Sequence, residues 1–274
     1  MSFLEALLLG LIQGITEFLP ISSTAHLRVI PTLVGWNDPG AAVSAVIQLG
    51  TLLAVLVYFR RDILRLLKAF IAGFVTRKPF KSVDSRMAWW VAFGTIPVLL
   101  GGLIFKHAIQ TSFRSLYVIA ASLFLLGILL IVAEKVSSFR RPIEEMKWWE
   151  SLLVGIAQAL ALIPGSSRSG TTITASMFLG YTREAAARFS FLLSIPAVTA
   201  SGFYELYEIR HELAGSLGFE LIITTLVAAI SGYVAIEFLL RYLRTHTTYV
   251  FVWYRIALAI IILIVLKFGI VAQQ

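Results

Sequence analysis

The stretch that decides the fold is GLIQGITEFLPISSTAHLR, residues 10–28, which interrupts a strongly apolar sequence. Gln13 and Glu17 are four residues apart, so they lie on one face of a helix. Pro20 ends that helix, because proline has no backbone N–H and clashes with the preceding turn. A cluster of polar side chains follows directly: Ser22, Ser23, Thr24, His26 and Arg28.

The two apolar pieces around this cluster predict a hairpin that enters the membrane and returns. Residues 2–18 suit a helix, but the next piece, residues 24–34, is too short to cross about 30 Å of hydrocarbon. The tip of such a re-entrant hairpin exposes non-helical backbone. That backbone is tolerated only where it is buried in protein or faces a wet cavity.

A second segment, GIAQALALIPGSSRSGTTIT at residues 155–174, repeats this pattern about 145 residues later. A glycine is again followed three positions on by a glutamine, Gln158, and then by Pro164 and a cluster of hydroxyl side chains around Arg168. Two polar segments broken by proline, at matching positions in the two halves of an apolar chain, are typical of a site at membrane depth.

Composition identifies an integral membrane protein. Hydrophobic residues make up 58% of the 274, only 14% are charged and the mean hydropathy is +0.87. A soluble domain has about 25% charged residues. The net charge of +8 lies mostly in loops between apolar spans, so it indicates membrane orientation and no nucleic-acid partner is expected. The absence of cysteine excludes disulfide and thiolate chemistry.

Six further apolar stretches are long enough to span the bilayer: residues 41–59, 89–105, 116–133, 185–204, 221–240 and 249–267. With a second hairpin at about residues 151–180, each half holds one re-entrant helical hairpin and three transmembrane helices. Because three is odd, the second half must be inverted relative to the first. The sequence thus predicts an all-α polytopic membrane protein, a single membrane domain over residues 1–274 with two inverted repeats, at about 1–140 and 146–274.

The charges between the spans predict the orientation. The segment Arg60–Arg86 carries eight basic residues against two aspartates, so we expect it to form a cytoplasmic loop. The segment Glu205–Glu220 has four glutamates and one arginine, so we expect an external loop.

Arg168 is the most informative single residue, because a guanidinium at the centre of a membrane helix costs about 2.5–3.5 kcal/mol and usually marks function. One interpretation is a structural pairing with Glu17 that pins the two hairpins together. The other is binding of an oxyanion, since guanidinium recognises phosphate through a bidentate fork. The neighbouring glycines and hydroxyls suit the second interpretation, and a helix starting near Thr171 would point free N–H groups at the same place.

The first hairpin offers a base and hydroxyl groups. Glu17 could act as a general base or as a ligand for a hard divalent cation. Ser22, Ser23 and Thr24 could instead be simple N-caps of the returning helix. His26 is either a hydrogen-bonded core histidine or, three residues after Ser23, part of a Ser–His–Glu arrangement if the hairpin folds back.

The segments QGITEFLPISSTAH and PGSSRSGTT resemble the two signature motifs of the undecaprenyl-diphosphate phosphatase family, the bacitracin-resistance membrane phosphatases of cell-wall lipid recycling. The resemblance covers the whole chain: its length, both motifs, their spacing and the repeat. It implies removal of one phosphate from a C55 polyprenyl diphosphate at the outer face of the cytoplasmic membrane, usually with Mg²⁺ or Ca²⁺.

Carried onto this sequence, the resemblance implies a catalytic set of Glu17, Ser23, His26 and Arg168, with Glu17 as a candidate metal ligand. The candidate substrate-binding and phosphate-binding residues are Gln13, Ser22, Thr24, Gly165, Ser166, Ser167, Ser169, Gly170, Thr171 and Thr172. Gln13 departs from the two-glutamate form of the family, which puts a mechanism with two carboxylates in doubt. Whether Ser23, His26 or a water attacks phosphorus is open.

A function from another class fits the same architecture. Two inverted repeats with broken helices could form a carrier that moves a lipid phosphate across the bilayer, with Arg168 as its binding group. In either case the partners are a polyprenyl lipid and the phospholipid bilayer. The sequence leaves open whether the chain forms a homo-oligomer.

Overall fold

The computed structural model describes residues 1–211 and 216–268, and within these residues it has twelve α-helices and two short 3₁₀-helices. The prediction of an all-α polytopic fold is confirmed. Six of the helices are long and apolar enough to cross a membrane: α3 (Gly40–Tyr58), α5 (Val83–Ile104), α7 (Leu116–Val136), α10 (Arg183–Glu208), α11 (Ser216–Thr245) and α12 (Tyr249–Lys267). Each overlaps one of the six predicted spans.

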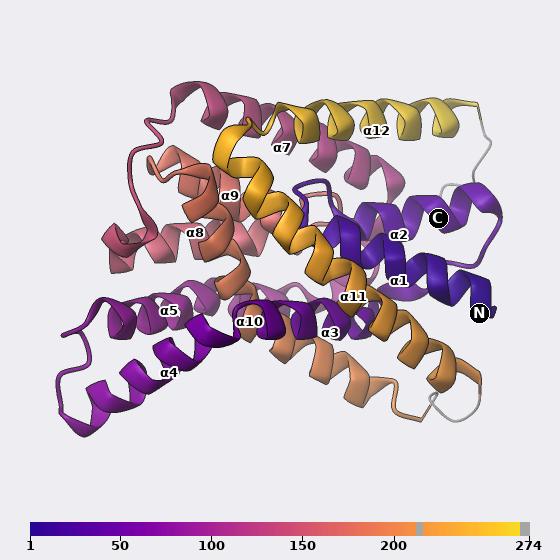
Figure 1. Cartoon of the computed structure of the whole chain (residues 1–274). Helices are drawn as coiled ribbons and strands as arrows, with labels where there is room; N and C mark the ends of the chain where they lie inside the picture. The colour runs from indigo at the N-terminus through magenta and orange to yellow at the C-terminus, as the bar shows by residue number, and fades with distance from the viewer. Residues whose placement is uncertain (212–215, 269–274) are drawn as a thin grey trace.

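The two proline-broken segments form the expected pairs of short helices. The first hairpin consists of α1 (Phe3–Phe18) and α2 (Ser23–Val34), and the second of α8 (Trp148–Leu160) and α9 (Arg168–Phe178). The two hairpins extend toward opposite ends of the molecule (Figure 1). The relation of the two halves by an inverted repeat stays a prediction.

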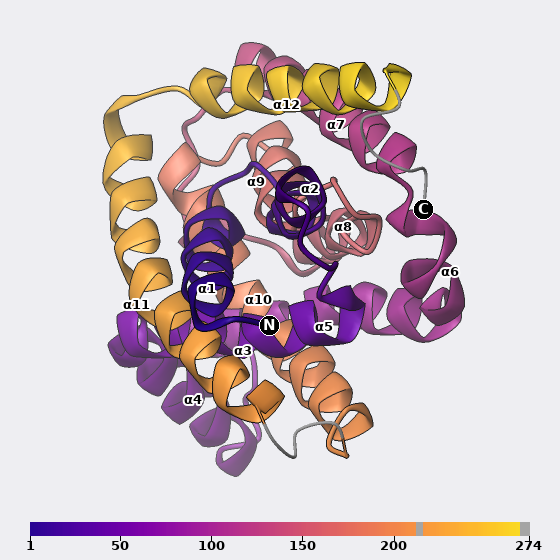
Figure 2. The same cartoon turned by 90° about the vertical axis from the view of Figure 1, so that its right-hand side faces the viewer.

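The hairpins occupy the middle of the molecule. Seen from the end that carries α1 and α2, the four hairpin helices lie inside a surround formed by the long helices (Figure 2). At the tip of the first hairpin, Phe18 is fully buried and packs edge-on against Phe191 of α10, with ring centroids 5.2 Å apart. The functional motifs are therefore shielded by protein, as their non-helical backbone requires.

A glycine in each hairpin allows this close packing. A methyl group at Gly10 would lie 2.5 Å from the carbonyl oxygen of Thr224 in α11. At Gly155, which has the matching position in the second hairpin, it would lie 2.1 Å from the carbonyl oxygen of Gly94 in α5. Small residues of this kind let membrane helices approach closely, where van der Waals packing holds them together.

Hydrogen bonds anchor the end of the second hairpin that lies away from its tip. Arg141 donates to Glu150 of α8 at 2.6 Å, and the hydroxyl of Tyr181 donates to the same carboxylate at 2.6 Å. Burial raises the pKa of Glu150, but these hydrogen bonds outweigh it and leave that pKa below its ordinary value. Burial and the carboxylate both raise the pKa of Tyr181, so the hydroxyl remains a donor.

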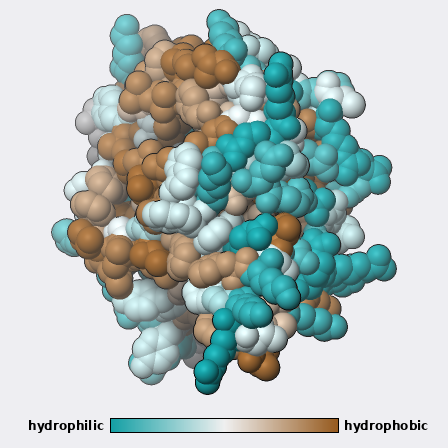
Figure 3. Space-filling view, turned by 90° about the vertical axis from the view of Figure 1, so that its left-hand side faces the viewer, coloured by the Kyte–Doolittle hydropathy of each residue, from teal (hydrophilic) through white to brown (hydrophobic). Residues whose placement is uncertain are grey.

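The segment Arg60–Arg86 corrects one prediction, because most of it is helix α4 (Arg60–Val75) rather than a loop. The basic residues of this segment alternate with apolar residues, which together form an amphipathic helix. One side packs Leu66 and Gly73 against the protein, while an apolar stripe faces outward. This stripe consists of Leu64, Leu67, Ile71, Phe74 and Val75. The end of the molecule where α4 turns into α5 shows many hydrophilic side chains (Figure 3).

Short helices also lie between the spans, and the predicted external loop differs in length. The segment between α5 and α7 contains α6 (Lys106–Gln110) and the 3₁₀-helix Ser112–Arg114. The other 3₁₀-helix, Ile143–Glu145, lies between α7 and α8. The expected loop Glu205–Glu220 is shorter than predicted, because α10 continues to Glu208 and α11 begins at Ser216. Residues 212–215 of that loop lie outside the described residues.

Candidate active site

Glu17, the penultimate residue of α1, is the centre of the candidate site and is buried. Its Oε2 accepts hydrogen bonds from Gln13 Nε2 at 2.8 Å and from Ser23 Oγ at 2.5 Å. Its Oε1 accepts from Arg168 Nη2 at 2.9 Å. The structure thus brings together residues from both motifs, 151 positions apart in the sequence, around one carboxylate.

Arg168 is the first residue of α9, so this helix begins three residues before the expected position near Thr171. The N-terminus of a helix carries the positive end of the helix dipole, and a cation there is unfavourable unless an anion is close. Glu17 supplies that anion in this structure, and Arg168 Nη1 also donates to the carbonyl oxygen of Ser190 at 3.4 Å. Helix dipole and guanidinium together make this place suited to an anion.

The hydroxyls of the first hairpin have separate roles. Ser22 is the N-cap of α2 and accepts from the N–H of Ala25 at 3.3 Å, so the capping interpretation is confirmed for Ser22. Thr24 Oγ1 lies 3.1 Å from Ser22 Oγ and accepts from the N–H of Gly165, at 3.4 Å, in the second hairpin. Ser23 is no cap: its hydroxyl points to Glu17.

The hydroxyls of the second hairpin mostly hold helices together. Ser167 is the N-cap of α9 and accepts from the N–H of Gly170 at 3.1 Å. Ser169 Oγ donates to the carbonyl oxygen of Leu19, at 3.1 Å, in the tip of the first hairpin. Thr172 Oγ1 donates to Ser190 Oγ of α10 at 2.6 Å.

The remaining predicted phosphate contacts are Thr171, which donates to the carbonyl oxygen of Arg168 at 3.1 Å, and Ser166, which is buried in the tip. Gly165 has a φ of +92°, and a methyl group there would lie 2.5 Å from the carbonyl oxygen of Ile119. This glycine is thus required by both the turn and the close approach of α7.

His26 is held apart from Ser23. Its Nδ1 lies 2.7 Å from the carbonyl oxygen of Ser22 and its Nε2 lies 2.6 Å from the hydroxyl of Tyr254 in α12. Because a carbonyl only accepts, Nδ1 carries the proton and Nε2 accepts from the tyrosine. Ser23 therefore bonds directly to Glu17, and the order differs from the Ser–His–Glu arrangement considered from the sequence.

Arg255 of α12 is a site residue that the sequence reasoning missed. It is completely buried and its guanidinium donates to five backbone carbonyl oxygens. Three of these belong to the hairpin tips: Pro20 at 3.2 Å, Gly165 at 3.2 Å and Ser166 at 3.1 Å. The sequence signal that identifies it is an arginine inside an apolar span, which is the same signal that identified Arg168.

Gly170 makes room for this arginine. A methyl group at that position would lie 2.6 Å from Arg255 Nη1, too close for any carbon atom. Arg255 thus fixes both hairpin tips relative to α12, and a glycine in the second motif is necessary for that contact.

The oxygen atoms around Glu17 suit a hard divalent cation. The side-chain oxygen of Gln13 is buried and has no hydrogen-bond partner within the described residues. Within the same residues no group of three or more histidines, aspartates or glutamates is arranged to hold a metal by itself. Mg²⁺ is usually held by one or two carboxylates together with substrate phosphates, and one carboxylate with an unpaired amide oxygen fits that pattern.

The arrangement combines three chemical capacities in one buried place. A carboxylate is within proton-transfer distance of a serine hydroxyl, a guanidinium can form two parallel hydrogen bonds with an oxyanion, and an unpaired amide oxygen can accept a donor or a cation. Such a set suits transfer of a phosphoryl group from an anionic substrate.

The chain matches known proteins over nearly its whole length. The family model described as bacitracin resistance protein BacA matches residues 6–261. A protein of Chloroherpeton thalassium named undecaprenyl-diphosphatase is 53% identical over 279 residues, covering 98% of this chain and 98% of the relative. Proteins with the same name from Myxococcus xanthus and Chlorobaculum tepidum are 55% and 49% identical, each over 98% of this chain and over 91% and 99% of the relative.

Proposed function

Because the chain belongs to the bacitracin resistance protein BacA family, we propose that it is an undecaprenyl-diphosphatase of the membrane. It hydrolyses undecaprenyl diphosphate to the monophosphate and inorganic phosphate, which recycles the lipid carrier for cell-wall synthesis. The observation that carries this proposal is the meeting of Ser23 and Arg168 at the carboxylate of Glu17: Ser23 Oγ lies 2.5 Å from Oε2 and Arg168 Nη2 lies 2.9 Å from Oε1.

In the mechanism that this geometry supports, Arg168 binds the oxygens of the diphosphate through its guanidinium fork and stabilises the charge that spreads over them. Glu17 accepts the proton of Ser23. The serine oxygen then bonds to the terminal phosphorus, the bond from phosphorus to the bridging oxygen breaks, and undecaprenyl monophosphate leaves with the proton that Glu17 had accepted.

Water then cleaves the phosphoserine, releases inorganic phosphate and restores the serine hydroxyl. Mass spectrometry of protein quenched during turnover tests this order, because it should detect phosphate on Ser23. Turnover without any phosphorylated enzyme would mean that Glu17 activates water for direct attack.

A divalent cation, Mg²⁺ or Ca²⁺, completes the proposed site. Glu17 and the side-chain oxygen of Gln13 would hold it, and when bound it would neutralise charge on the diphosphate oxygens. Activity should fall on addition of a chelator and return with either cation. Binding of the cation alone, measured by calorimetry, should weaken in Gln13→Ala.

We further propose that the protein lies in the cytoplasmic membrane, with the first hairpin opening to the outer face. The basic residues around α4 support a cytoplasmic position for the end shown in Figure 3. Cysteines at Ser82 and Ser112 test it with an impermeant thiol reagent on intact cells. Label at Ser112 alone is expected, and label at Ser82 alone would reverse the orientation.

Phosphate release from the purified protein in detergent tests the function itself. Detergent micelles have no two sides, so a lipid-phosphate carrier with the same architecture would release none. A phosphatase should release phosphate from undecaprenyl diphosphate at a rate that depends on enzyme concentration.

A further inference from the structure

We propose that the polyprenyl tail of the substrate leaves the site sideways between α2 and α12, past Tyr254, and lies in the apolar groove beyond it. The inference rests on the proposed function and adds the place where the lipid is recognised. It follows from three observations: a thin barrier beside His26, a small apolar groove farther along the same two helices, and the sealing of the larger apolar groove between α1 and α11.

The barrier is the pair formed by His26 and Tyr254. His26 is buried one helical turn after Ser23, whose hydroxyl contacts Glu17. The ring of Tyr254 stacks on the imidazole with centroids 5.5 Å apart, and 45% of this tyrosine is exposed on the outside of α12. A single aromatic ring therefore separates the histidine from the surrounding lipid, and one hydrogen bond holds the ring in place.

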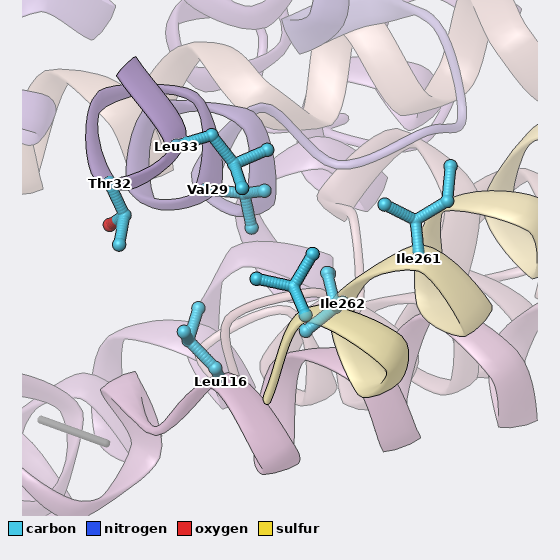
Figure 4. A pocket seen from close by; sticks show the side chains of 7 residues that line it. Val29, Thr32, Leu33, Leu116, Ile261 and Ile262 are labelled. Carbon is cyan, nitrogen blue, oxygen red and sulfur yellow. The ribbon is translucent and has the colours of Figure 1, made fainter. Parts of the chain in front are cut away.

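A small apolar groove of about 10 Å³ lies farther along the same two helices, where the tail would pass over it. Val29 and Leu33 of α2 face Leu116 of α7 and Ile262 of α12 across it (Figure 4). Val29 and Leu33 follow His26 by three and seven residues, so they continue the side of α2 that carries the histidine. The groove is lined by apolar side chains apart from Thr32, which matches the chemistry of an isoprenoid chain.

A larger apolar groove of about 650 Å³ lies between α1 and α11, but its position makes it unsuitable for the substrate tail. Its α1 residues, Leu11 and Ile15, lie two positions from Gln13 and Glu17, and thus on nearly the opposite face of the helix. A tail could reach this groove only around the tip of the first hairpin. That path is closed, because the carbonyl oxygens of Leu19 and Pro20 are bonded to Ser169 and Arg255.

The experiment compares the two grooves with matched substitutions. Leu33→Trp combined with Ile261→Trp fills the α2–α12 groove, and Leu11→Trp combined with Ile230→Trp fills the α1–α11 groove. All four side chains are exposed, and the two leucines are nearly equal at 46% and 44%. The substrates are the undecaprenyl, farnesyl and dimethylallyl diphosphates, and the readouts are KM and kcat of the purified proteins.

The variant with tryptophans at positions 33 and 261 should raise KM for undecaprenyl diphosphate about tenfold, which corresponds to about 1.4 kcal/mol of binding. The increase should shrink as the tail shortens. The variant with tryptophans at positions 11 and 230 should keep the parental KM for all three substrates. An increase confined to that second variant, or equal increases in both, would overturn the assignment.

A second measurement covers the case in which a tryptophan variant fails to fold. A photoreactive benzophenone amino acid at position 33 should cross-link to undecaprenyl diphosphate, whereas the same group at position 11 should not. The reverse result would place the tail between α1 and α11. If the parent protein releases no phosphate from any of the three diphosphates, the proposed function itself fails, whichever groove is labelled.

Discussion

The two hairpins have the same backbone arrangement but carry side chains of opposite charge, a carboxylate in the first and a guanidinium in the second. In each, a glutamine stands nine residues before a serine that caps the returning helix, Gln13 before Ser22 and Gln158 before Ser167. Both serines have positive φ values, 74° and 68°, a conformation that residues other than glycine rarely adopt. The local structure around the two caps is therefore nearly the same.

The difference lies at two matching positions. Four residues after the glutamine, the first hairpin has Glu17 and the second has Leu162. Directly after the capping serine, the first has Ser23 and the second has Arg168. In the proposed mechanism one hairpin supplies the base and the hydroxyl and the other supplies the guanidinium, so catalysis would require that the two tips meet.

Removing the base should have the largest effect. Glu17→Gln keeps the shape of the side chain but cannot accept a proton, so kcat should fall about 10³–10⁴-fold. Gln13→Ala, one turn earlier on the same face, should lose far less, because it removes one oxygen ligand of the proposed cation but leaves the base in place. Steady-state phosphate release measures both. Comparable losses would show that the amide is as necessary as the acid.

Replacing the guanidinium of the second hairpin should have the next largest effect. Arg168→Lys keeps a positive charge beside Glu17 but loses the planar fork, so kcat should fall about 10²–10³-fold, as for loss of one transition-state donor. Thermal unfolding in detergent should remain close to that of the parent. A near-parental kcat would reduce Arg168 to a generic charge, and loss of folding would favour a purely structural pairing.

Loosening the contact between the hairpins should have an intermediate effect. Arg255→Lys has at most three donors for the carbonyl oxygens that the guanidinium binds, so the tips should shift relative to each other. A misplacement of about 1 Å can cost up to about 10²-fold in rate. Both kcat and the unfolding temperature should fall. A lower unfolding temperature with unchanged kcat would limit Arg255 to a role in stability.

The capping serines should show the smallest effect and test the equivalence of the two backbones. Ser22→Ala and Ser167→Ala each lose a cap hydrogen bond at positive φ, at a cost of about 1 kcal/mol or slightly more. Glycine at either position should cost only a few tenths of a kcal/mol, because it tolerates this conformation. Denaturation in mixed micelles compares the four variants. Alanine variants as stable as the glycine variants would disprove the capping argument.

Most of the fold could be predicted from the sequence, because membrane spans and proline breaks are local signals. Gln13 and Glu17 share a helix face by spacing alone, and Arg168 stands out inside an apolar segment. Helix α4 could not be predicted from charge alone, because its basic residues indicate orientation and do not show that the apolar residues between them form one face of a helix. Its outward stripe becomes visible only once the packed side, Leu66 and Gly73, is known.

The candidate site could be predicted only in part. A pairing of Glu17 with Arg168 is one of the two interpretations that the sequence offers, whereas it gives no signal for the partner of His26, because Tyr254 is 228 positions away. No spacing rule connects the two residues. The direct contact between Ser23 and Glu17 likewise depends on how the chain turns after Pro20, which hydropathy does not determine.

Arg255 has a consequence for how the protein is made. It lies in the last span, so the ribosome synthesises both hairpins long before the residue that joins them. A single arginine near the middle of a span opposes insertion by about 2.5–3.5 kcal/mol, while each surrounding leucine or isoleucine favours it by about 0.3–0.6 kcal/mol. The span Tyr249–Lys267 has eight leucines and isoleucines, enough to offset this cost, so we expect it to insert before its arginine finds partners. Its five backbone partners belong to earlier segments of the chain, so we expect the proposed site to be completed last and a chain truncated before α12 to insert without becoming active.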